Sequence, residues 1–379
     1  MTSRFDIRRV LPSVIAPIAA VLLAAGICSL ILISSGKNPS VAFGAMFDRA
    51  FVGEASPATL TNIINKSTGY YLSAIAVAIG FRMGLFNIGV DGQYRLAAVL
   101  AGGLGASSMV AWMPGPLQIL TVIIVAMVVG GIWAGIAALL KVYRGVSEVI
   151  STIMLNFVSG SILAYLLTTD RLGVIAPGGQ LITSRPLPAD THMPNFTHLT
   201  GTSNRIVGFT LIAAALGFAY WFLLGRTRFG FDLRASGLNA SAAVASGVNA
   251  KRMIVMTMVI SGGVAGLVGL PDLMGHDYVV YTTIGGLGFT GIAVALLGRN
   301  HPVGIAFAAL LWAFLDESRF ALDLQDIPKE TIVIMQGVTV LVVVVAYELA
   351  ARISRRQQQR IVGQATGETQ ATPAPVGGA

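Results

Sequence analysis

The sequence predicts an all-α polytopic membrane protein, and three features of its composition and patterning lead to that fold class. Hydrophobic residues make up 55% of the 379 residues and charged residues only 11%, too little charge to cover the surface of a soluble domain. Apolar runs of about 18 residues or more recur along the chain, and each can cross a hydrocarbon core of roughly 30 Å. The 44 glycines suit helices that pack closely in a membrane.

Ten membrane-spanning helices are expected. The first apolar run, which follows Arg4, Arg8 and Arg9, is longer than the core of a signal peptide, so it should stay as the first helix. The ten spans cover about 11–35, 58–80, 92–112, 117–140, 148–167, 206–224, 253–270, 285–298, 302–318 and 329–350. SSGKNP ends the first span, MPGP ends the third, and Lys141 with Arg144 end the fourth. Lys66 lies within the second span, so it must snorkel or face an aqueous vestibule.

Two connecting segments are long. The segment 170–205 is rich in proline, serine and threonine and is expected to form an exterior loop. The segment 225–252 is basic and rich in small residues and is expected in the cytosol. We therefore expect a membrane domain over 1–355 and a disordered cytosolic tail over 356–379, where polar residues cannot form a core.

Basic residues set the orientation. With the N-terminus inside, the cytosolic pieces hold about twice as many Lys and Arg residues as the exterior pieces. Both termini are therefore expected in the cytosol. The net charge of +8 follows from basic residues that flank apolar segments, which indicates membrane topology and no nucleic-acid partner.

The segment 81–100, FRMGLFNIGVDGQYRLAAVL, is unusual for a continuous membrane helix. It combines three glycines with Asn87, Asp91 and Gln93, and each buried polar group needs a partner. One interpretation is a helix broken where irregular backbone lines a protected cavity, as in transporters. The other is a loop edge at which Asp91 caps a new helix, and the two can hold together.

A second glycine-broken motif, GGLGFTGIAV at 285–294, introduces the eighth span as GLFNIGVDGQ at 84–93 introduces the third. Their separation by five helices places them on opposite membrane faces, as two halves of a 5+5 inverted repeat require. The alternative is two unrelated packing segments. Asn156 in the fifth span also allows two interpretations: it forms a helix–helix hydrogen bond, or it contacts the solute.

Three classes of transporter compete. A secondary carrier needs ionisable residues within its helices, and the candidates Asp91, Glu148, Asp272 and Glu348 all lie near helix ends. No channel filter is visible, and the four histidines lack metal-ligand spacing, with Asp272–His276–Asp277 only a weak match to a metal or catalytic cluster. The third class is a subunit driven from outside the membrane.

The cytosolic loop fits that third class. Residues 233–248 alternate small and apolar side chains, so a short helix bracketed by Gly237 and Gly247 can lie along the membrane surface and enter a groove on a soluble partner. A surface helix without a partner is the alternative. The chain contains no GxxxxGK[ST] motif, so ATP hydrolysis must belong to another polypeptide.

Five motifs in order, GLFNIGVDGQ, SEVISTIMLNF, RASGLNASAAVASGVNAKR, GFTGIAVALLGRNHPVG and IPKETIVIMQG, carry a family resemblance over about 80–355. The chain resembles the membrane permeases of ABC importers for nucleosides and simple sugars, within the wider group of branched-chain amino acid permeases. The family motif commonly has glutamate where this chain has Asp91, and the segment 170–205 is less typical.

The resemblance implies a permease subunit in the bacterial plasma membrane that pairs with a second, different permease. An ABC ATPase would bind ATP and Mg²⁺, with no cofactor on this chain, and an extracytoplasmic lipoprotein would deliver the solute. The segment 233–248 would be the coupling helix that docks on the ATPase. Its expected contact residues are Arg234, Gly237, Leu238, Asn239, Ala242, Ala243 and Gly247.

Residues from both glycine-broken motifs and the fifth span are expected to line the solute pathway, because amides and carboxylates bond polar edges and phenylalanines stack on flat rings. They are Phe86, Asn87, Asp91, Gln93, Asn156, Phe289 and Thr290. The expected function is ATP-driven import of nucleosides. The alternatives are simple sugars or a related solute, and a stand-alone secondary carrier.

Overall fold

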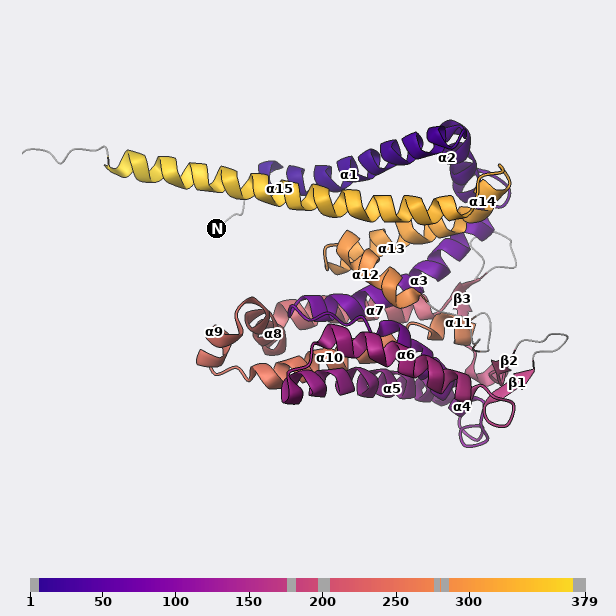
Figure 1. Cartoon of the computed structure of the whole chain (residues 1–379). Helices are drawn as coiled ribbons and strands as arrows, with labels where there is room; N and C mark the ends of the chain where they lie inside the picture. Colours follow the sequence, from indigo (N-terminus) through magenta and orange to yellow (C-terminus); the bar gives the residue numbers. More distant parts are fainter. Residues whose placement is uncertain (1–6, 176–181, 197–204, 276–279, 281–285, 371–379) are drawn as a thin grey trace, which may run out of the picture. The chain divides into compact units, whose positions relative to one another are not determined.

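The computed structural model describes residues 7–175, 182–196, 205–275, 280 and 286–370, and the chain divides into two compact units. The first unit comprises residues 1–42 and 327–379, and the second comprises residues 43–326. The order of the elements can be followed in Figure 1.

The first unit contains two long helices, α1 (Ile7–Ser34) and α15 (Glu330–Gln370), which pack side by side (Figure 1). Helix α2 (Pro39–Phe47) begins in this unit. The expected disordered tail is wrong for 356–370, because α15 continues to Gln370. Glutamine, which favours helix, is the commonest residue in this stretch, and the first proline after it is Pro373. Residues 371–379 lie outside the described residues.

The second unit is a helical bundle. It contains the π-helix η1 (Asp48–Val52), α3 (Ser56–Phe81), α4 (Val90–Gly105), α5 (Gly115–Arg144), α6 (Glu148–Leu166), α7 (Phe209–Arg226), α8 (Arg228–Leu238), α9 (Ala240–Ala245), α10 (Ala250–Gly266), α11 (Leu270–Gly275), α12 (Leu287–Leu297), α13 (Pro302–Glu317) and α14 (Arg319–Asp323). Helix α3 lies at its centre and packs on α7, α10, α12 and α13.

Small residues let two helices approach closely. A Cβ on Gly130 of α5 would overlap the carbonyl oxygen of Gly262 in α10, and one on Gly266 would overlap the Ala126 carbonyl oxygen. The close packing of α5 on α10 therefore requires glycine at these positions, as expected for helices that associate in a membrane.

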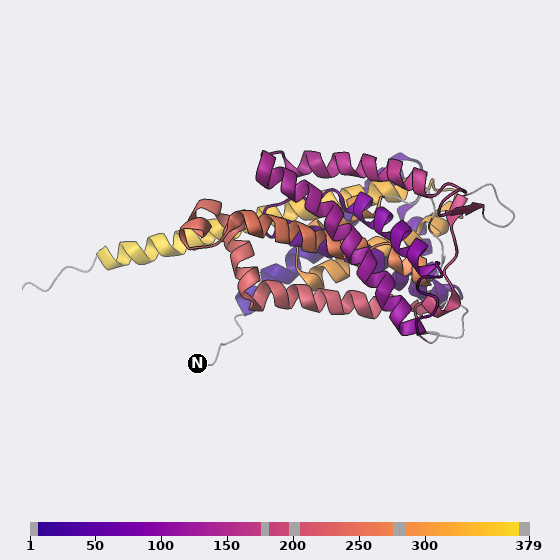
Figure 2. The ribbon, with the colours of Figure 1, turned by 90° about the horizontal axis from the view of Figure 1, so that it is seen from below.

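The segment 170–205 contains short structured elements. Strands β1 (Gly173–Ile175) and β2 (Ile182–Ser184) pair antiparallel, with Val174 opposite Thr183. The 3-10 helix η2 (Ala189–Thr191) follows, and β3 (Asn195–Phe196) pairs antiparallel with β4 (Ile206–Val207). These strands lie at one end of the second unit, and α8 and α9 lie at the other (Figures 1 and 2).

A helix occurs at each of the ten places where a span is expected, although α4 ends at Gly105, earlier than the expected 112. Five described helical stretches are long and apolar enough to cross a membrane: α5, α6, α7, residues 250–275 and residues 330–349. Ala19–Ser34 and α12 are shorter apolar helices. The prediction of a polytopic helical membrane protein is confirmed.

Candidate functional site

The first glycine-broken motif begins in a tight turn after α3. The Leu85 amide donates to the Gly80 carbonyl at 3.0 Å, and Gly84 takes the left-handed conformation with φ +73° that glycine adopts without strain. The chain then runs through Asn87 to α4, which begins at Val90. The expected interruption of the helix is therefore present.

Two amide side chains in this motif bond to each other. Asn87 donates to Gln93 Oε1 at 2.9 Å, and Gln93 donates back to Asn87 Oδ1 at 2.8 Å. Asn87 also accepts from the Gly89 amide at 3.1 Å and donates to Ser261 Oγ of α10 at 2.9 Å. Both amides are 1% exposed, so their hydrogen-bonding groups serve the fold.

Asn156 of α6 bonds across to the same motif. Its Oδ1 accepts from the Gly92 amide and its Nδ2 donates to the Ile88 carbonyl, both at 2.9 Å. A Cβ on Gly92 would lie 2.8 Å from Asn156 Oδ1, so glycine is needed for this approach. Of the two interpretations of Asn156, the observed hydrogen bonds fit the structural one, because they join α6 to the first turn of α4 and to the turn before it.

Asp91 joins the two glycine-broken motifs. Its Oδ1 accepts from the Gly286 amide at 2.9 Å and from the Gly288 amide at 3.1 Å, at the start of α12. Asp91 also lies in the first turn of α4, so its carboxylate sits at the positive ends of two helices. The carboxylate supplies the acceptor that the first amides of a helix lack.

Two of the three remaining predicted pathway residues are exposed. Phe86 is 48% exposed, with its ring 5.0 Å from that of Phe81, and Phe289 is 58% exposed. Thr290, in the first turn of α12, is half-buried. These three side chains are free of the internal network, and contact with a solute stays a prediction for them.

The predicted helix over 233–248 is wrong in its boundaries. Helix α8 begins at Arg228 and ends at Leu238, and α9 begins after Asn239, whose backbone is extended and whose side chain accepts from the Ala242 amide at 3.0 Å. Asn239 is therefore an N-cap that divides the segment. Gly247, with φ +85°, follows α9 as expected.

Gly237 has a different role from the expected helix breaker. It lies inside α8, and a Cβ there would come 2.8 Å from Met83 Cα and 2.9 Å from the Arg82 carbonyl oxygen. Glycine thus lets α8 rest directly on the turn after α3. Through this contact, the segment 225–252 adjoins the first broken motif.

The other predicted coupling residues divide by exposure. Leu238 is 89% exposed and Ala242 is exposed, whereas Ala243 is buried and Arg234 is half-buried. The exposed apolar side chains Phe231, Leu238 and Val244 also lie on α8 and α9. Several exposed apolar side chains on one segment fit a contact with a protein or a membrane, whereas a single one would carry no such meaning.

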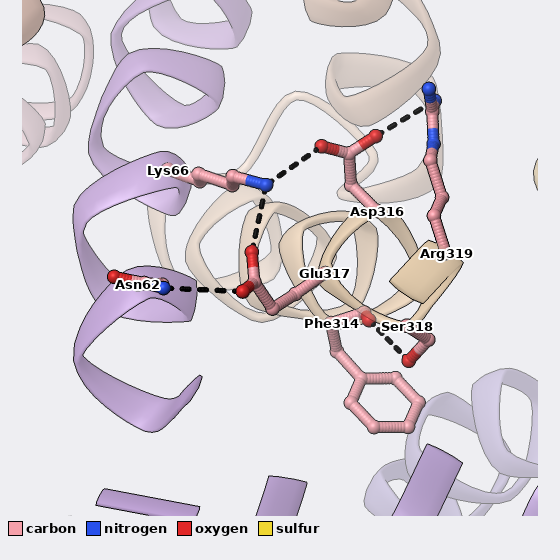
Figure 3. Close-up of polar contacts among 7 residues, drawn as sticks. All are labelled: Asn62, Lys66, Phe314, Asp316, Glu317, Ser318 and Arg319. Atoms are coloured by element: carbon pink, nitrogen blue, oxygen red, sulfur yellow. Dashed lines mark hydrogen bonds and ion pairs between the residues drawn. The ribbon is translucent and has the colours of Figure 1, made fainter. Parts of the chain in front are cut away.

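Lys66 belongs to a polar network, which Figure 3 shows. Its Nζ pairs with Glu317 at 2.7 Å and with Asp316 at 3.3 Å, while Arg319 pairs with Asp316 at 2.7 Å and Asn62 donates to Glu317 at 3.2 Å. The sequence predicted that Lys66 snorkels or faces an aqueous vestibule, and it gave no sign of the two carboxylates that the side chain contacts.

Within the described residues, no group of three or more His, Cys, Asp or Glu side chains is placed to hold a metal. His276 and Asp277 lie outside those residues. Ser73 and Ser261 were missed: Ser73 donates to the Leu287 carbonyl at 2.7 Å and Ser261 to the Ala76 carbonyl at 2.6 Å. The one feature of the sequence that could have identified these two serines is a hydroxyl residue within an apolar run.

Replacement of Asp91 by alanine should destabilise the chain by at least about 2 kcal/mol, because a hydrogen bond to a buried charged group contributes roughly 1.5–3 kcal/mol. Thermal unfolding of the purified protein in detergent measures the effect. Asp170→Ala, at an exposed position, is the matched control. Equal unfolding temperatures for the two variants would contradict a structural role for the Asp91 bonds.

A double-mutant cycle with Lys66→Met and Glu317→Gln should give a coupling of about 1 kcal/mol, above the ~0.3–0.5 kcal/mol of an exposed helical pair. Glu317 is largely buried, but the Lys66 side chain is 42% exposed and solvent screens the pair. Arg352→Met with Glu348→Gln, an exposed pair at 2.8 Å, is the control cycle. Indistinguishable coupling in the two cycles would show that burial adds nothing to the Lys66 network.

Comparison with known proteins adds the family. Residues 59–344 match the family described as the permease component of the branched-chain amino acid transport system. The guanosine ABC transporter permease protein NupP of Bacillus subtilis is 32% identical over 354 residues, covering 89% of this chain and 95% of the relative. The nucleoside ABC transporter permease protein NupB of Lactococcus lactis is 29% identical, with 88% and 91% covered.

A glucose ABC transporter permease protein of Haloferax volcanii is 28% identical, with 89% of this chain and 90% of the relative covered. The similarity thus extends over nearly the whole of each relative, including both glycine-broken motifs and the segment with α8 and α9. The chain belongs to the branched-chain amino acid transport permease family, as a multi-pass subunit of an ABC importer in the bacterial plasma membrane and not an enzyme.

Proposed function

We propose that this permease forms half of a membrane pathway for nucleosides and that a separate ATPase drives it. The substrate class is supported by the two relatives whose names specify guanosine and nucleosides. The glucose permease at 28% identity keeps simple sugars as the second candidate. A second, different permease subunit and an extracytoplasmic binding lipoprotein complete the proposed importer, with ATP and Mg²⁺ on the ATPase.

The observation that carries the proposal is the contact between α8 and the turn after α3. An ATPase bound at Leu238 and Ala242 would press on α8, and Gly237 lies against Met83 with no side chain between. The network of Asn87, Gln93 and Asn156 then ties that turn to α4, α6 and α10. A push at α8 would therefore move these helix ends together.

We also propose ten membrane crossings in a 5+5 inverted repeat, with both termini in the cytosol. The packing supports this symmetry. In the proposed repeat, α3 corresponds to α10, α4 to α12 and α5 to α13. The contact between α3 and α13 then corresponds to the contact between α10 and α5, and both contacts are observed. Likewise, the contact between α3 and α12 corresponds to the contact between α10 and α4. The contact between α4 and α12, where Asp91 bonds to the Gly286 amide, corresponds to itself. In this arrangement α4 and α12 begin beside each other at Asp91 and come from opposite sides of the membrane, which suits an alternating-access pathway.

The first experiment is gentle purification of the chain from its native membrane, followed by uptake of labelled guanosine into proteoliposomes of the purified assembly. An ATPase and a second permease should co-purify, and uptake should need ATP. Labelled glucose is the competing substrate. Gradient-driven uptake by the chain alone, without ATP, would establish a secondary carrier and overturn the proposal.

Ala242→Arg should lower ATP-dependent uptake at least about tenfold. An unpaired charge buried in an interface costs roughly 3–5 kcal/mol, well above the ~1.4 kcal/mol that corresponds to a factor of ten. Because Ala242 is exposed, the variant should still fold and insert, whereas Ala243 is buried and a bulky residue there would disturb packing.

The control for this variant is Ala189→Arg, an equally exposed alanine in η2 at the opposite end of the second unit. It should retain the ATPase during purification, and Ala242→Arg should lose it. Retention of an active ATPase by Ala242→Arg would place the docking site elsewhere than on α9.

A further inference from the structure

The second unit carries an apolar groove that the proposed transport path does not use. The groove measures about 790 Å³, within the ~300–1,000 Å³ of small-ligand sites, and it runs between α3, α7 and α13. Its walls include Tyr71 of α3, Ala214 and Trp221 of α7, and Phe307 of α13. Phe218 and Phe307 at its edge are 64% and 70% exposed, so the groove opens on the outside of the bundle.

The hydroxyl groups of Ser67, Thr68 and Thr210 in the walls have local partners, and this limits the kind of ligand that the groove can bind. Ser67 donates to the Ile64 carbonyl at 2.8 Å, and Thr68 and Thr210 bond to each other at 3.0 Å. A sugar or nucleoside buried here would leave most of its own hydroxyls unpaired, because few polar groups in the walls remain besides the Tyr71 hydroxyl and the His301 ring. Each unpaired hydroxyl costs roughly 1–3 kcal/mol. The groove therefore favours a hydrocarbon ligand.

The end of the groove near the C-terminus of α7 has basic and aromatic side chains. Trp221 lines the wall, the Arg226 guanidinium lies 5.7 Å from the centre of its ring, and His301 lines the wall from the residue before α13. Aromatic rings and arginine at a helix end are typical of the level of lipid headgroups. An anionic headgroup there would complement the Arg226 charge.

We propose that the α3–α7–α13 groove binds an anionic phospholipid, with an acyl chain between the helices and the phosphate beside Arg226. The occupant follows from the chemistry of the walls, the outward opening and the charge at one end. The site is separate from the pathway residues and from α8 and α9. Under the proposed topology, the headgroup lies in the cytosolic leaflet.

Brominated lipids test the site, because a brominated acyl chain quenches the fluorescence of a tryptophan that it touches. The protein is the full chain with Trp112, Trp133 and Trp312 replaced by phenylalanine, in phosphatidylcholine vesicles containing brominated phosphatidylglycerol. Trp221 should be quenched at a lower mole fraction of brominated phosphatidylglycerol than of brominated phosphatidylcholine, by about fivefold for one basic contact. Arg226→Gln should remove that difference.

Two alanines that are neighbours on α7 give a matched pair of variants. Ala214 lines the groove and Ala215 does not, and both are exposed, so phenylalanine fits at either without displacing the core. Ala214→Phe should abolish the preferential quenching, and Ala215→Phe should retain it. Equal quenching by the two brominated lipids in the unsubstituted groove would overturn the proposal.

Native mass spectrometry of the importer assembly, with all four tryptophans present, provides a second measurement if the single-tryptophan protein fails to fold. Phosphatidylglycerol should remain bound to the parent and to Ala215→Phe, and be lost from Ala214→Phe. Two outcomes would refute the lipid site. In one, all three proteins retain phosphatidylglycerol. In the other, the parent carries no bound lipid because a second permease covers the groove.

Discussion

The need to satisfy buried helix ends is the constraint on which this permease depends. Helix α4 begins among buried residues, and Gly288 in the first turn of α12 is buried as well. The first amides of a helix have no partner within it, and water is scarce inside a membrane bundle. Asp91 supplies that partner for α12, and Asn87 and Asn156 supply it for Gly89 and Gly92.

Glycine makes these bonds possible, because at these positions the neighbouring groups approach the backbone too closely to leave room for a Cβ. A Cβ on Gly288 would come 2.6 Å from the Asp91 amide nitrogen, and one on Gly291 would overlap the Ser73 hydroxyl. The glycines and the polar residues of the two motifs are therefore parts of one arrangement. Substituting either kind would leave an amide without its acceptor.

The sequence located the helices well and their contacts poorly, for a physical reason. An apolar run and its flanking charges are local features, so the apolar helices and the break before α4 were predictable. A lone polar residue shows that a partner is needed but not which one, and the pairing of Lys66 with Glu317 was therefore missed. Gly237 was misread because a glycine that ends a helix and one that permits close contact look alike in sequence.

The internal use of the polar side chains bears on selectivity in the proposed importer. With Asn87, Asp91, Gln93 and Asn156 bonded to the protein, Phe86 and Phe289 are the exposed members of the predicted pathway set. Apolar contacts separate similar solutes by only a few kcal/mol, whereas sites with dedicated hydrogen bonds discriminate far more strongly. A pathway of this kind holds its solute weakly and releases it readily, so discrimination between a nucleoside and a sugar would belong to the binding lipoprotein.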